Sequence, residues 1–221
     1  METVSLEKLK EQIAILEKRG VPKELIAILR PGDRVVFVKI RGLPPGLLMN
    51  NPKSMKCYVE GKRVCVHNVP ITERCDACIE ARAYRKADGE LYIPSRWIYN
   101  SLVRAFSSYK IKGARGKRFT AADVAGLLAI FPTEIGLGVK SYQVHESFVV
   151  IQRNRVIRYR PWLPEWQASF WMKIDQSFGT NLNKVRMALE DAGSRIGIGD
   201  YRPAKKGPFG RFIVESFEVI I

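Results

Sequence analysis

Apolar residues recur every three or four positions at the start of the chain and predict a first helix. They are Leu6, Leu9, Ile13 and Leu16. Ser5 can cap this helix at its beginning, and Gly20 ends it. Pro22 opens a second, shorter helix that continues through Leu29. We therefore predict that residues 1–31 form a helical N-terminal extension, which either packs on the core or contacts a neighbouring molecule.

The remaining periodic segments divide into strands, with β-branched or alternating apolar residues, and helices, with apolar residues at helical spacing. The predicted strands are 34–42, 142–154, 166–174 and 210–221. The predicted helices are 95–109, 120–131 and 180–193. When the helix at 120–131 is set aside as part of an insertion, the order of the elements is strand, helix, strand, strand, helix, strand. That order is typical of an α+β protein with a ferredoxin-like βαββαβ core.

Two insertions interrupt this predicted core domain, which spans residues 32–221. The first, 43–92, contains every cysteine of the chain. The second, 110–141, combines a basic loop with the helix predicted at 120–131. The chain has no internal repeat and no low-complexity tract, so one core with two decorations accounts for its length.

Charge changes this picture from a generic α+β domain to one with a polyanionic partner. Lys and Arg number 37 against 22 acids, which gives a net charge of +15. Such a surplus favours nucleic acid, and the alternative is the basic surface of a thermophilic protein. The N-terminus is polar, and the longest apolar run, VAGLLAIF, is too short to span a bilayer. We therefore expect an intracellular, cytoplasmic protein.

The four cysteines lie within 22 residues of one another. They are Cys57, Cys65, Cys75 and Cys78. A hairpin turning around Gly61 would set Cys57 opposite Cys65, and CDAC supplies a second thiol pair. Four thiolates can close a structural, tetrahedral Zn²⁺ site that leaves no open catalytic position. Two disulfides or free thiols are the alternatives, and His67 is either a substitute ligand or a loop residue.

Two basic stretches without any acid are candidate phosphate contacts. The first, 101–119, supplies Arg104, Lys110, Lys112, Arg115, Lys117 and Arg118. The second, 151–162, supplies Arg153, Arg155, Arg158 and Arg160. Arginines beside Tyr159 suit a single-stranded chain, with guanidinium on phosphate and ring on base. The alternative is that Tyr159 and Trp162 lie in the core while the arginines pair with carboxylates.

A glycine-rich stretch, GIGDYRPAKKGPFGRF at 197–212, precedes the last strand. Its glycines permit positive φ and a close backbone approach, and consecutive N–H groups in such a loop can bind an anion. Its basic residues are Arg202, Lys205, Lys206 and Arg211. The pattern is neither a P-loop nor a dinucleotide fingerprint. We expect the loop to close on a phosphate backbone.

These residues resemble the RAMP superfamily, the RRM-like proteins that include the backbone subunits of CRISPR effector complexes. AGSRIGIGDYRPAKKGPFGRF is similar to the C-terminal glycine-rich loop of that superfamily. LYIPSRWIYNSLVRAF resembles its conserved helix, with Arg104 in place of the helix arginine. LPPGLLMNNP resembles the segment that approaches guide RNA. The resemblance spans 34–221 and is closest to small stand-alone members of the phage or plasmid type.

The resemblance implies an RRM-like palm and protomers that stack side by side along single-stranded nucleic acid. The matching positions in this sequence are Asn50, Lys53, Arg96, Asn100, Arg104, Arg202 and Arg211. Target-cleaving members carry an aspartate after the first strand, whereas residues 42–55 of this chain contain no acid. We therefore expect a non-catalytic protein that binds single-stranded RNA or DNA, RNA being favoured, as a homo-oligomer with possible effector-complex partners.

Two other functions remain open at this point. One is a structural or assembly protein of a virus or plasmid, whose basic surface meets nucleic acid only incidentally. The other is a metal-independent, guide-processing endoribonuclease that uses His145, one of only two histidines. No HxxxE, HExxH or GxSxG motif is present to support other hydrolytic chemistry.

Overall fold

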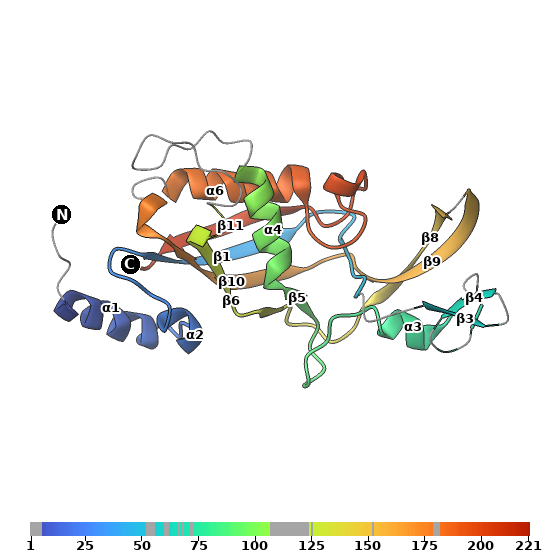
Figure 1. Ribbon diagram of the computed structural model, residues 1–221, viewed down its shortest axis with the longest axis horizontal. Helices are drawn as coiled ribbons and strands as arrows, with labels where there is room; N and C mark the ends of the chain where they lie inside the picture. Colours follow the sequence, from blue (N-terminus) through green and yellow to red (C-terminus); the bar gives the residue numbers. More distant parts are fainter. Residues whose placement is uncertain are drawn as a thin grey trace.

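The protein combines helices with antiparallel sheets, as expected for an α+β fold (Figure 1). The computed structural model describes residues 6–51, 56–59, 62–65, 67, 69–70, 73–106, 124, 126–151, 153–178 and 182–221. Within those ranges, no helix is both long and apolar enough to cross a membrane.

A four-stranded antiparallel sheet forms the centre of the molecule. Its strands are β1 (Arg34–Gly42), β6 (Leu128–Phe131), β10 (Gln167–Ile174) and β11 (Phe212–Val219), in the order β11-β1-β10-β6. In β1, buried Val36, Val38 and Ile40 alternate with exposed Lys39 and Arg41. This period of two directs one face of the sheet into the main core.

Two helices cover that apolar face of the sheet (Figure 1). They are α4 (Ser95–Phe106) and α6 (Leu182–Asp191), and α6 continues into the π-helical turn η2 (Ala192–Ile196). The first of these helices buries Ile98, Leu102 and Ala105, and the second buries Val185 and Leu189. Both sets recur at three- or four-residue spacing, so each helix presents one apolar stripe to the sheet.

The N-terminal helices pack against the opposite side of the molecule, below the sheet in Figure 1. They are α1 (Leu6–Lys18) and α2 (Lys23–Ile26). Leu16 and Leu25 form a second small core with Val35 of β1. At the start of β1, the buried Asp33 carboxylate accepts from Lys173 Nζ at 2.9 Å. The extension therefore packs on the core, the first of the two predicted alternatives.

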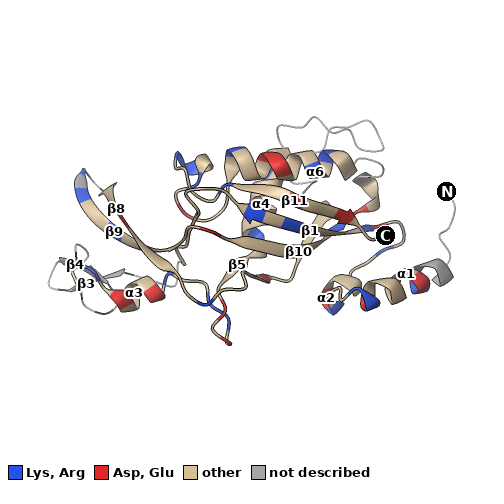
Figure 2. Ribbon diagram, turned by 180° about the vertical axis from the view of Figure 1, so that it is seen from behind, with Lys and Arg blue, Asp and Glu red and all other residues tan. Residues whose placement is uncertain are grey.

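A long hairpin extends away from this core and forms a second sheet (Figures 1 and 2). Its strands are β8 (Gln143–Ile151) and β9 (Asn154–Leu163), and β9 also pairs with the short β2 (Leu47–Leu48). The expectation that 142–154 is the second core strand is therefore wrong. The segment alternates well enough for a strand, but the alternation cannot say which sheet the strand joins.

The second core strand is instead β6, in the segment expected to end a helix at Phe131. Helical residues are described at 124 and 126–127, and Leu128–Phe131 then pairs with β10. Buried Leu128 and Ile130 alternate with less buried Ala129 and Phe131. A four-residue apolar run fits either period, so the partner strand decides the outcome.

Small elements occupy the first insertion and the margin of the core. They are β3 (Lys56–Val59), β4 (Lys62–Cys65), α3 (Asp76–Glu80), β5 (Tyr92–Pro94) and β7 (Glu134–Gly136). The pair β3–β4 and helix α3 lie beside the hairpin β8–β9, whereas β5 pairs with β7 next to α4 (Figure 1). Two 3-10 turns complete the described elements, Gln176–Phe178 and η3 (Pro203–Lys205).

Candidate nucleic-acid interface

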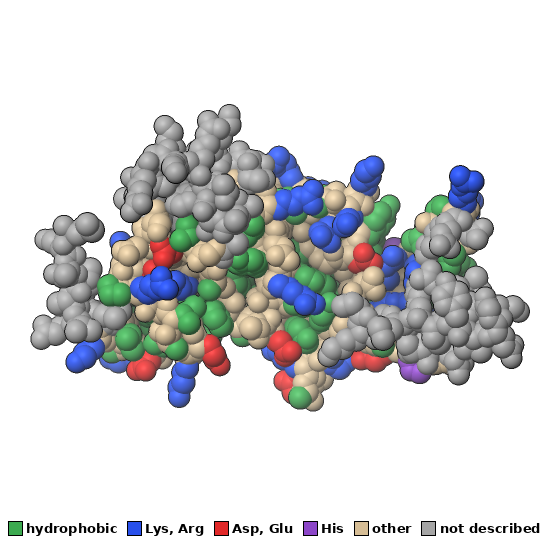
Figure 3. All heavy atoms as spheres, in the orientation of Figure 1, with side chains coloured by type: hydrophobic (Ala, Val, Ile, Leu, Met, Phe, Trp, Pro, Cys, Tyr) green, Lys and Arg blue, Asp and Glu red, His purple; other side chains and the backbone are tan. Residues whose placement is uncertain are grey.

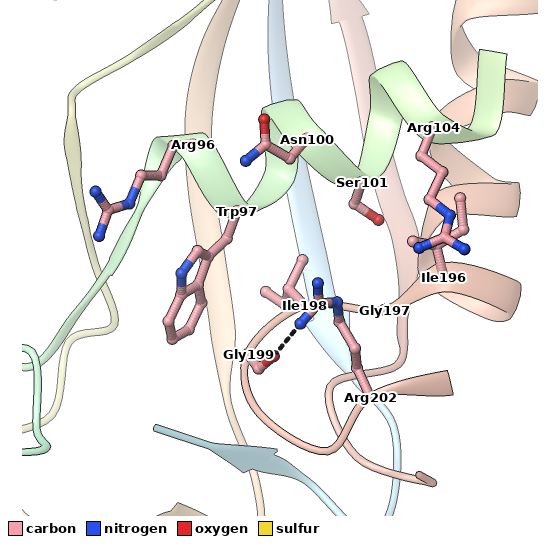
Figure 4. A pocket seen from close by; sticks show the side chains of 10 residues that line it. All are labelled: Arg96, Trp97, Asn100, Ser101, Arg104, Ile196, Gly197, Ile198, Gly199 and Arg202. Carbon is pink, nitrogen blue, oxygen red and sulfur yellow. Dashed lines mark hydrogen bonds between the residues drawn. The ribbon is translucent and has the colours of Figure 1, made fainter. Parts of the chain in front are cut away.

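A basic hollow lies where α4 meets the glycine-rich loop, residues 197–211. Its volume is about 400 Å³. Its lining consists of Arg96, Trp97, Asn100, Ser101, Arg104, Ile196, Gly197, Ile198, Gly199 and Arg202. The two lining segments are separated by about a hundred residues of sequence, and the fold places them side by side (Figure 4). We call this hollow the arginine pocket.

Helix α4 supplies one wall of the arginine pocket because of a simple spacing. Arg96, Asn100 and Arg104 are four residues apart and exposed, so they follow one another along the same face of the helix. The buried Ser101 hydroxyl donates to the Ala192 carbonyl oxygen at 3.2 Å. This bond fixes α4 to the π-helical turn, from which the other wall begins.

The glycine-rich loop supplies the second wall, and two of its glycines are required by close packing. Gly199 has a φ of +75°, and a Cβ there would lie 2.6 Å from the Leu48 carbonyl oxygen. Gly210 has a φ of +71°, and a Cβ there would lie 1.7 Å from the Ile198 carbonyl oxygen. A side chain at Gly199 would push the loop away from β2, and one at Gly210 would separate the backbone there from the backbone at Ile198. The glycines therefore allow the close backbone approach that was predicted for this loop.

The arginine pocket concentrates positive charge. Arg202 Nη1 donates to the Gly199 carbonyl oxygen at 2.8 Å, which holds this guanidinium beside residues 196–199 (Figure 4). Arg104 reaches toward the same segment from α4. The lining contains three arginines and, among the described residues, no Asp or Glu. Basic side chains gather over α4 and the adjoining loop in the surface view (Figure 3). Such a hollow attracts an anion.

Beside this pocket, one acid holds two of the predicted contact residues. Arg160 Nε donates to Asp200 Oδ2 at 2.6 Å, with the two side chains 13% and 29% exposed. Asn50 Nδ2 donates to the same oxygen at 3.3 Å, and Arg160 Nη1 donates to Ser147 Oγ at 3.1 Å. Asp200 therefore joins the glycine-rich loop to β9. For the stretch 151–162, the alternative prediction was that its arginines pair with carboxylates, and this is correct for Arg160.

The other predicted contact residues lie outside the pocket lining. Arg153 and Arg155 are exposed at the far end of the hairpin, and Arg158 follows on β9 (Figure 2). On the glycine-rich loop, the predicted contact residues Lys205, Lys206 and Arg211 are all exposed. Six predicted residues lie outside the described residues: Lys53, Lys110, Lys112, Arg115, Lys117 and Arg118. The fold thus brings together Arg96, Asn100, Arg104 and Arg202. Of the other described candidates, it places Lys205, Lys206 and Arg211 on the loop, and Arg153, Arg155, Arg158 and Arg160 on the hairpin.

His145, the candidate for histidine chemistry, lies at the contact between the hairpin and the glycine-rich loop. Its ring stands edge to face with Trp162 and Phe209, at centroid distances of 6.0 and 5.0 Å. Its Nδ1 is buried and has no hydrogen-bond partner among the described residues. Burial lowers the pKa of His145, and the nearby Arg160 lowers it further. The imidazole is therefore kept neutral and is not part of the arginine pocket.

A separate group of three residues could hold a metal ion. It consists of His67, Cys75 and Cys78, whose ligand atoms all lie within 4.8 Å of one another. His67 Nδ1 lies 3.1 Å from Cys78 Sγ and 3.9 Å from Cys75 Sγ. Cys75 caps α3, because its sulfur accepts from the Cys78 N–H. Nitrogen and sulfur donors of this kind suit zinc.

The register of the β3–β4 pair contradicts the predicted pairing of the other two cysteines. Cys57 pairs with Val64, and Cys65 pairs with Lys56. Directly opposed residues share a face and successive residues alternate, so Cys57 and Cys65 occupy positions on opposite faces. Setting Cys57 opposite Cys65 requires a three-residue turn, whereas the observed turn between Val59 and Lys62 has two residues. A shift of one residue in the register moves each side chain of one strand to the other face of the pair.

Three residues of these sites were not predicted as such. Trp97 fits the apolar spacing of the predicted helix 95–109, and it also lines the arginine pocket. Asp200 was passed over among its basic neighbours, although it is the one acid in the sequence 197–212. His67 was left between two roles. The usable signals were the four-residue spacing of polar side chains on α4 and the proximity of His67 to CDAC.

Comparisons with known proteins add little to this description. No family model and no curated protein matches the sequence. A solved structure that is similar is a chain from the "Cryo-EM structure of the Type III-B Cmr-beta bound to cognate target RNA". It has a TM-score of 0.48 and 11% sequence identity, and the match covers 95% of this chain. This chain spans 66% of the length of that one. A similarity at this level defines neither a family nor a function.

Proposed function

We propose that this protein binds single-stranded nucleic acid, with RNA preferred over DNA, and that it oligomerises along the strand without cleaving it. The observation that carries the proposal is the arginine pocket, where three guanidiniums and an amide line one hollow with no acid among its described residues. A pocket of this composition suits the phosphate groups of a polynucleotide backbone. The preference for RNA comes from the resemblance of the pocket's two segments to RAMP-superfamily motifs.

We also infer that the central sheet is ferredoxin-like. When its strands are numbered along the chain, the sheet order β11-β1-β10-β6 becomes fourth, first, third, second. Helix α4 lies between the first and second strands of the chain, and α6 lies between the third and fourth. Both helices cover one face of the sheet. These features support a βαββαβ core and, with it, kinship to the RAMP superfamily.

The pocket favours an unpaired strand for a geometric reason. Arg96, Arg104 and Arg202 lie around one recess beside the half-buried Trp97 ring. A flexible single strand can bend a phosphate into such a recess, whereas the backbone of a stiff duplex meets a protein along an extended surface. Trp97 offers a stacking partner for a neighbouring base.

The absence of catalysis is part of the proposal. Metal-independent RNA cleavage needs a general base within reach of the 2′-hydroxyl next to the scissile phosphate. The described lining of the arginine pocket contains no His, Asp, Glu, Lys or Tyr. His145 lies at the hairpin contact instead, with Nδ1 buried. RNA cleavage that His145→Ala abolishes without weakening binding would favour the endoribonuclease alternative.

Purified protein gives the first test. Co-purifying nucleic acid of regular length, seen as a raised 260/280 nm absorbance ratio that falls after nuclease treatment, supports the binder. Its absence supports a structural protein that meets nucleic acid incidentally. Affinity for a fluorescent single-stranded RNA should fall linearly with the logarithm of salt concentration, with a slope of about −0.7 for each phosphate contacted. An affinity that does not respond to salt would contradict phosphate binding.

We propose in addition that the first insertion holds a structural zinc ion. His67, Cys75 and Cys78 supply three ligands, and the hairpin β3–β4 supplies the fourth from either Cys57 or Cys65. A Cys3His set is a closed structural site. The metal would fix a short polar insertion that has little core of its own.

Cys57 and Cys65 occupy positions on opposite faces of the β3–β4 pair, so the zinc proposal predicts that only one of them is a ligand. Elemental analysis should give about one zinc per chain. His67→Ala should remove it, and only one of the variants Cys57→Ser and Cys65→Ser should do so. Zinc loss in both cysteine variants, with His67→Ala unaffected, would restore the four-cysteine site. No zinc in the wild type would leave disulfides or free thiols.

A further inference from the structure

The carboxylate of Asp200 receives the kinds of hydrogen bond that proteins use to hold a phosphate group. Its Oδ2 atom accepts from Arg160 Nε at 2.6 Å and from Asn50 Nδ2 at 3.3 Å. Its Oδ1 atom accepts from the Tyr201 backbone N–H at 3.0 Å. A guanidinium, a side-chain amide and a backbone N–H are common donors to phosphate oxygens in nucleic-acid complexes. These three donors therefore form an anion site, and an internal carboxylate occupies it.

The anion site joins parts of the chain that are distant in sequence. Asn50 follows β2, Arg160 belongs to β9, and Tyr201 belongs to the glycine-rich loop. Arg160 Nη1 also donates to Ser147 Oγ at 3.1 Å, which holds the guanidinium from a second side. Asn50 is exposed, and the Asp200 side chain is more exposed than that of Arg160. The carboxylate therefore covers the guanidinium on the side that faces solvent.

The conformation of the loop keeps the carboxylate in this position. The Asp200 N–H donates to the Leu48 carbonyl oxygen at 2.9 Å. Tyr201 has a φ of +48°, a left-handed conformation that is uncommon for residues other than glycine. A Cβ at Gly207 would lie 1.9 Å from the Tyr201 carbonyl oxygen, so the loop is tightly packed here as well. Backbone strain that the surrounding structure maintains is found most often at functional sites.

The anion site adjoins the arginine pocket. Gly199 and Arg202, which flank Asp200 in the sequence, both line that pocket. A polynucleotide has a phosphate on every nucleotide, so a strand held in the pocket brings further phosphates close to the neighbouring anion site. There the Asp200 carboxylate repels them, and it already neutralises Arg160.

We propose that Asp200 determines where the phosphate contacts of the strand end. Its carboxylate takes the place of a phosphate on Arg160 and Asn50, and it thereby keeps the strand off the base of the hairpin. This role accounts for the one acid in a stretch, 197–212, that is otherwise basic. The inference deepens the proposed function and rests on it for the ligand, the phosphate backbone of a single strand.

The main test is the variant Asp200→Ser, which removes the charge and makes room beside Arg160. Its affinity for a fluorescent single-stranded RNA should rise by about 5- to 20-fold at low salt, because a charged donor is released. Its salt slope should become steeper by about 0.7, the value for one added phosphate contact. Glu190→Gln removes the same charge from an exposed pair on α6 and should change affinity by less than about twofold.

A second substitution separates a covered anion site from simple repulsion. The double variant Asp200→Ser and Arg160→Gln should bind RNA within about threefold of wild type, because the released guanidinium is what the added phosphate contacts. A double variant that keeps the full gain would show that Asp200 only repels the strand. Unchanged affinity and slope in Asp200→Ser would also overturn the proposal. If that variant does not fold, Asp200→Asn removes the charge without the loss of volume and takes the same measurements.

Inorganic phosphate tests the anion site without nucleic acid. Urea denaturation is compared in phosphate and in chloride at equal ionic strength. The midpoint should rise more on addition of phosphate for Asp200→Ser than for wild type, because an ion that binds the folded state stabilises it. The double variant should respond as wild type does. Equal responses of wild type and Asp200→Ser would contradict a covered anion site.

Two outcomes separate this inference from the proposed function. If Asp200→Ser gains the response to phosphate but neither it nor wild type binds single-stranded RNA or DNA, the covered anion site stands and the proposed function fails. If wild type binds single-stranded RNA with the expected salt dependence but Asp200→Ser binds it identically, the proposed function stands and the role of Asp200 is refuted.

Discussion

The arginines of α4 and those of β9 both come from segments without an acid, yet they have different surroundings. Arg96 and Arg104 on α4 face a hollow whose described lining contains no acid. On β9, Arg160 is paired at 2.6 Å with Asp200, which comes from the glycine-rich loop 40 residues later. A run of sequence without acids therefore does not predict whether an acid from elsewhere in the chain pairs with one of its arginines, as Asp200 does with Arg160.

This difference separates two roles for the same residue type. Arg160 is only 13% exposed and joins the hairpin to the glycine-rich loop, so its guanidinium stabilises the structure. The pocket arginines instead direct charge at a space large enough for a phosphate group. The predictions below test whether the two groups can be separated in experiment.

The largest effect is expected on nucleic-acid affinity. The double variant Arg104→Ala and Arg202→Ala should weaken binding of single-stranded RNA by about 10- to 100-fold, because charged hydrogen bonds to phosphate are lost. It should also reduce the salt slope by about 1.4. Fluorescence anisotropy at several salt concentrations measures both quantities.

Two controls sharpen that result. Arg186→Ala removes an exposed arginine on α6 that pairs with Glu190, and Arg160→Ala removes the paired arginine of β9. Each should change affinity by less than about threefold, since overall net charge acts weakly at a distance in salt. Equal losses for all of these variants would mean that the pocket is not the site.

The second effect is on stability, and it should be larger for the partly buried Arg160–Asp200 pair than for an exposed pair on α6. Asp200→Ala leaves the Arg160 guanidinium largely buried without its carboxylate and removes an acceptor of Asn50. The free energy of unfolding should fall by about 1 to 3 kcal/mol. Glu190→Gln breaks the exposed Arg186 pair and should cost less than about 0.5 kcal/mol. Urea denaturation distinguishes them, and similar small losses would show that Asp200 is not structural.

The smallest effect is a pH dependence that arises where the hairpin meets the loop. Burial and Arg160 lower the pKa of His145 in the folded protein, so the unfolded chain takes up this proton first as the pH falls. The contribution to stability is fully present above the ordinary histidine pKa of about 6.5 and is lost as the pH falls toward the folded value. The charged group that acts on the ring is Arg160, which is itself paired with Asp200.

His145→Phe keeps an aromatic ring between Trp162 and Phe209 and removes the titration. Its free energy of unfolding should decrease less than that of wild type between about pH 8 and about pH 5.5. Carboxylates titrate alike in both proteins and cancel in the comparison. An identical pH dependence for the two proteins would show that His145 is not held neutral.

Much of the fold could be predicted from local periodicity, and the segments that were predicted wrongly share one cause. The helix α4 begins at the predicted Ser95, and the strands at 34–42 and 166–174 lie close to their predicted bounds. The segment 128–131 and the hairpin 143–163 were misassigned because pairing partners, not local pattern, choose the sheet that a strand joins. The same holds for Cys57 and Cys65, whose faces depend on a register set by one residue of turn length.

The sequence by itself determined the excess of positive charge, the position of each apolar stripe, the glycine-rich loop, and the four-residue spacing that places Arg96, Asn100 and Arg104 on one face of a helix. These are properties of neighbouring residues, so local geometry suffices to read them. Only the tertiary structure decided that Arg202 joins this face, that Asp200 instead neutralises Arg160, and that His67 meets Cys75 and Cys78. Each of these contacts joins residues of different elements or loops, and their distances are fixed by how the whole chain packs.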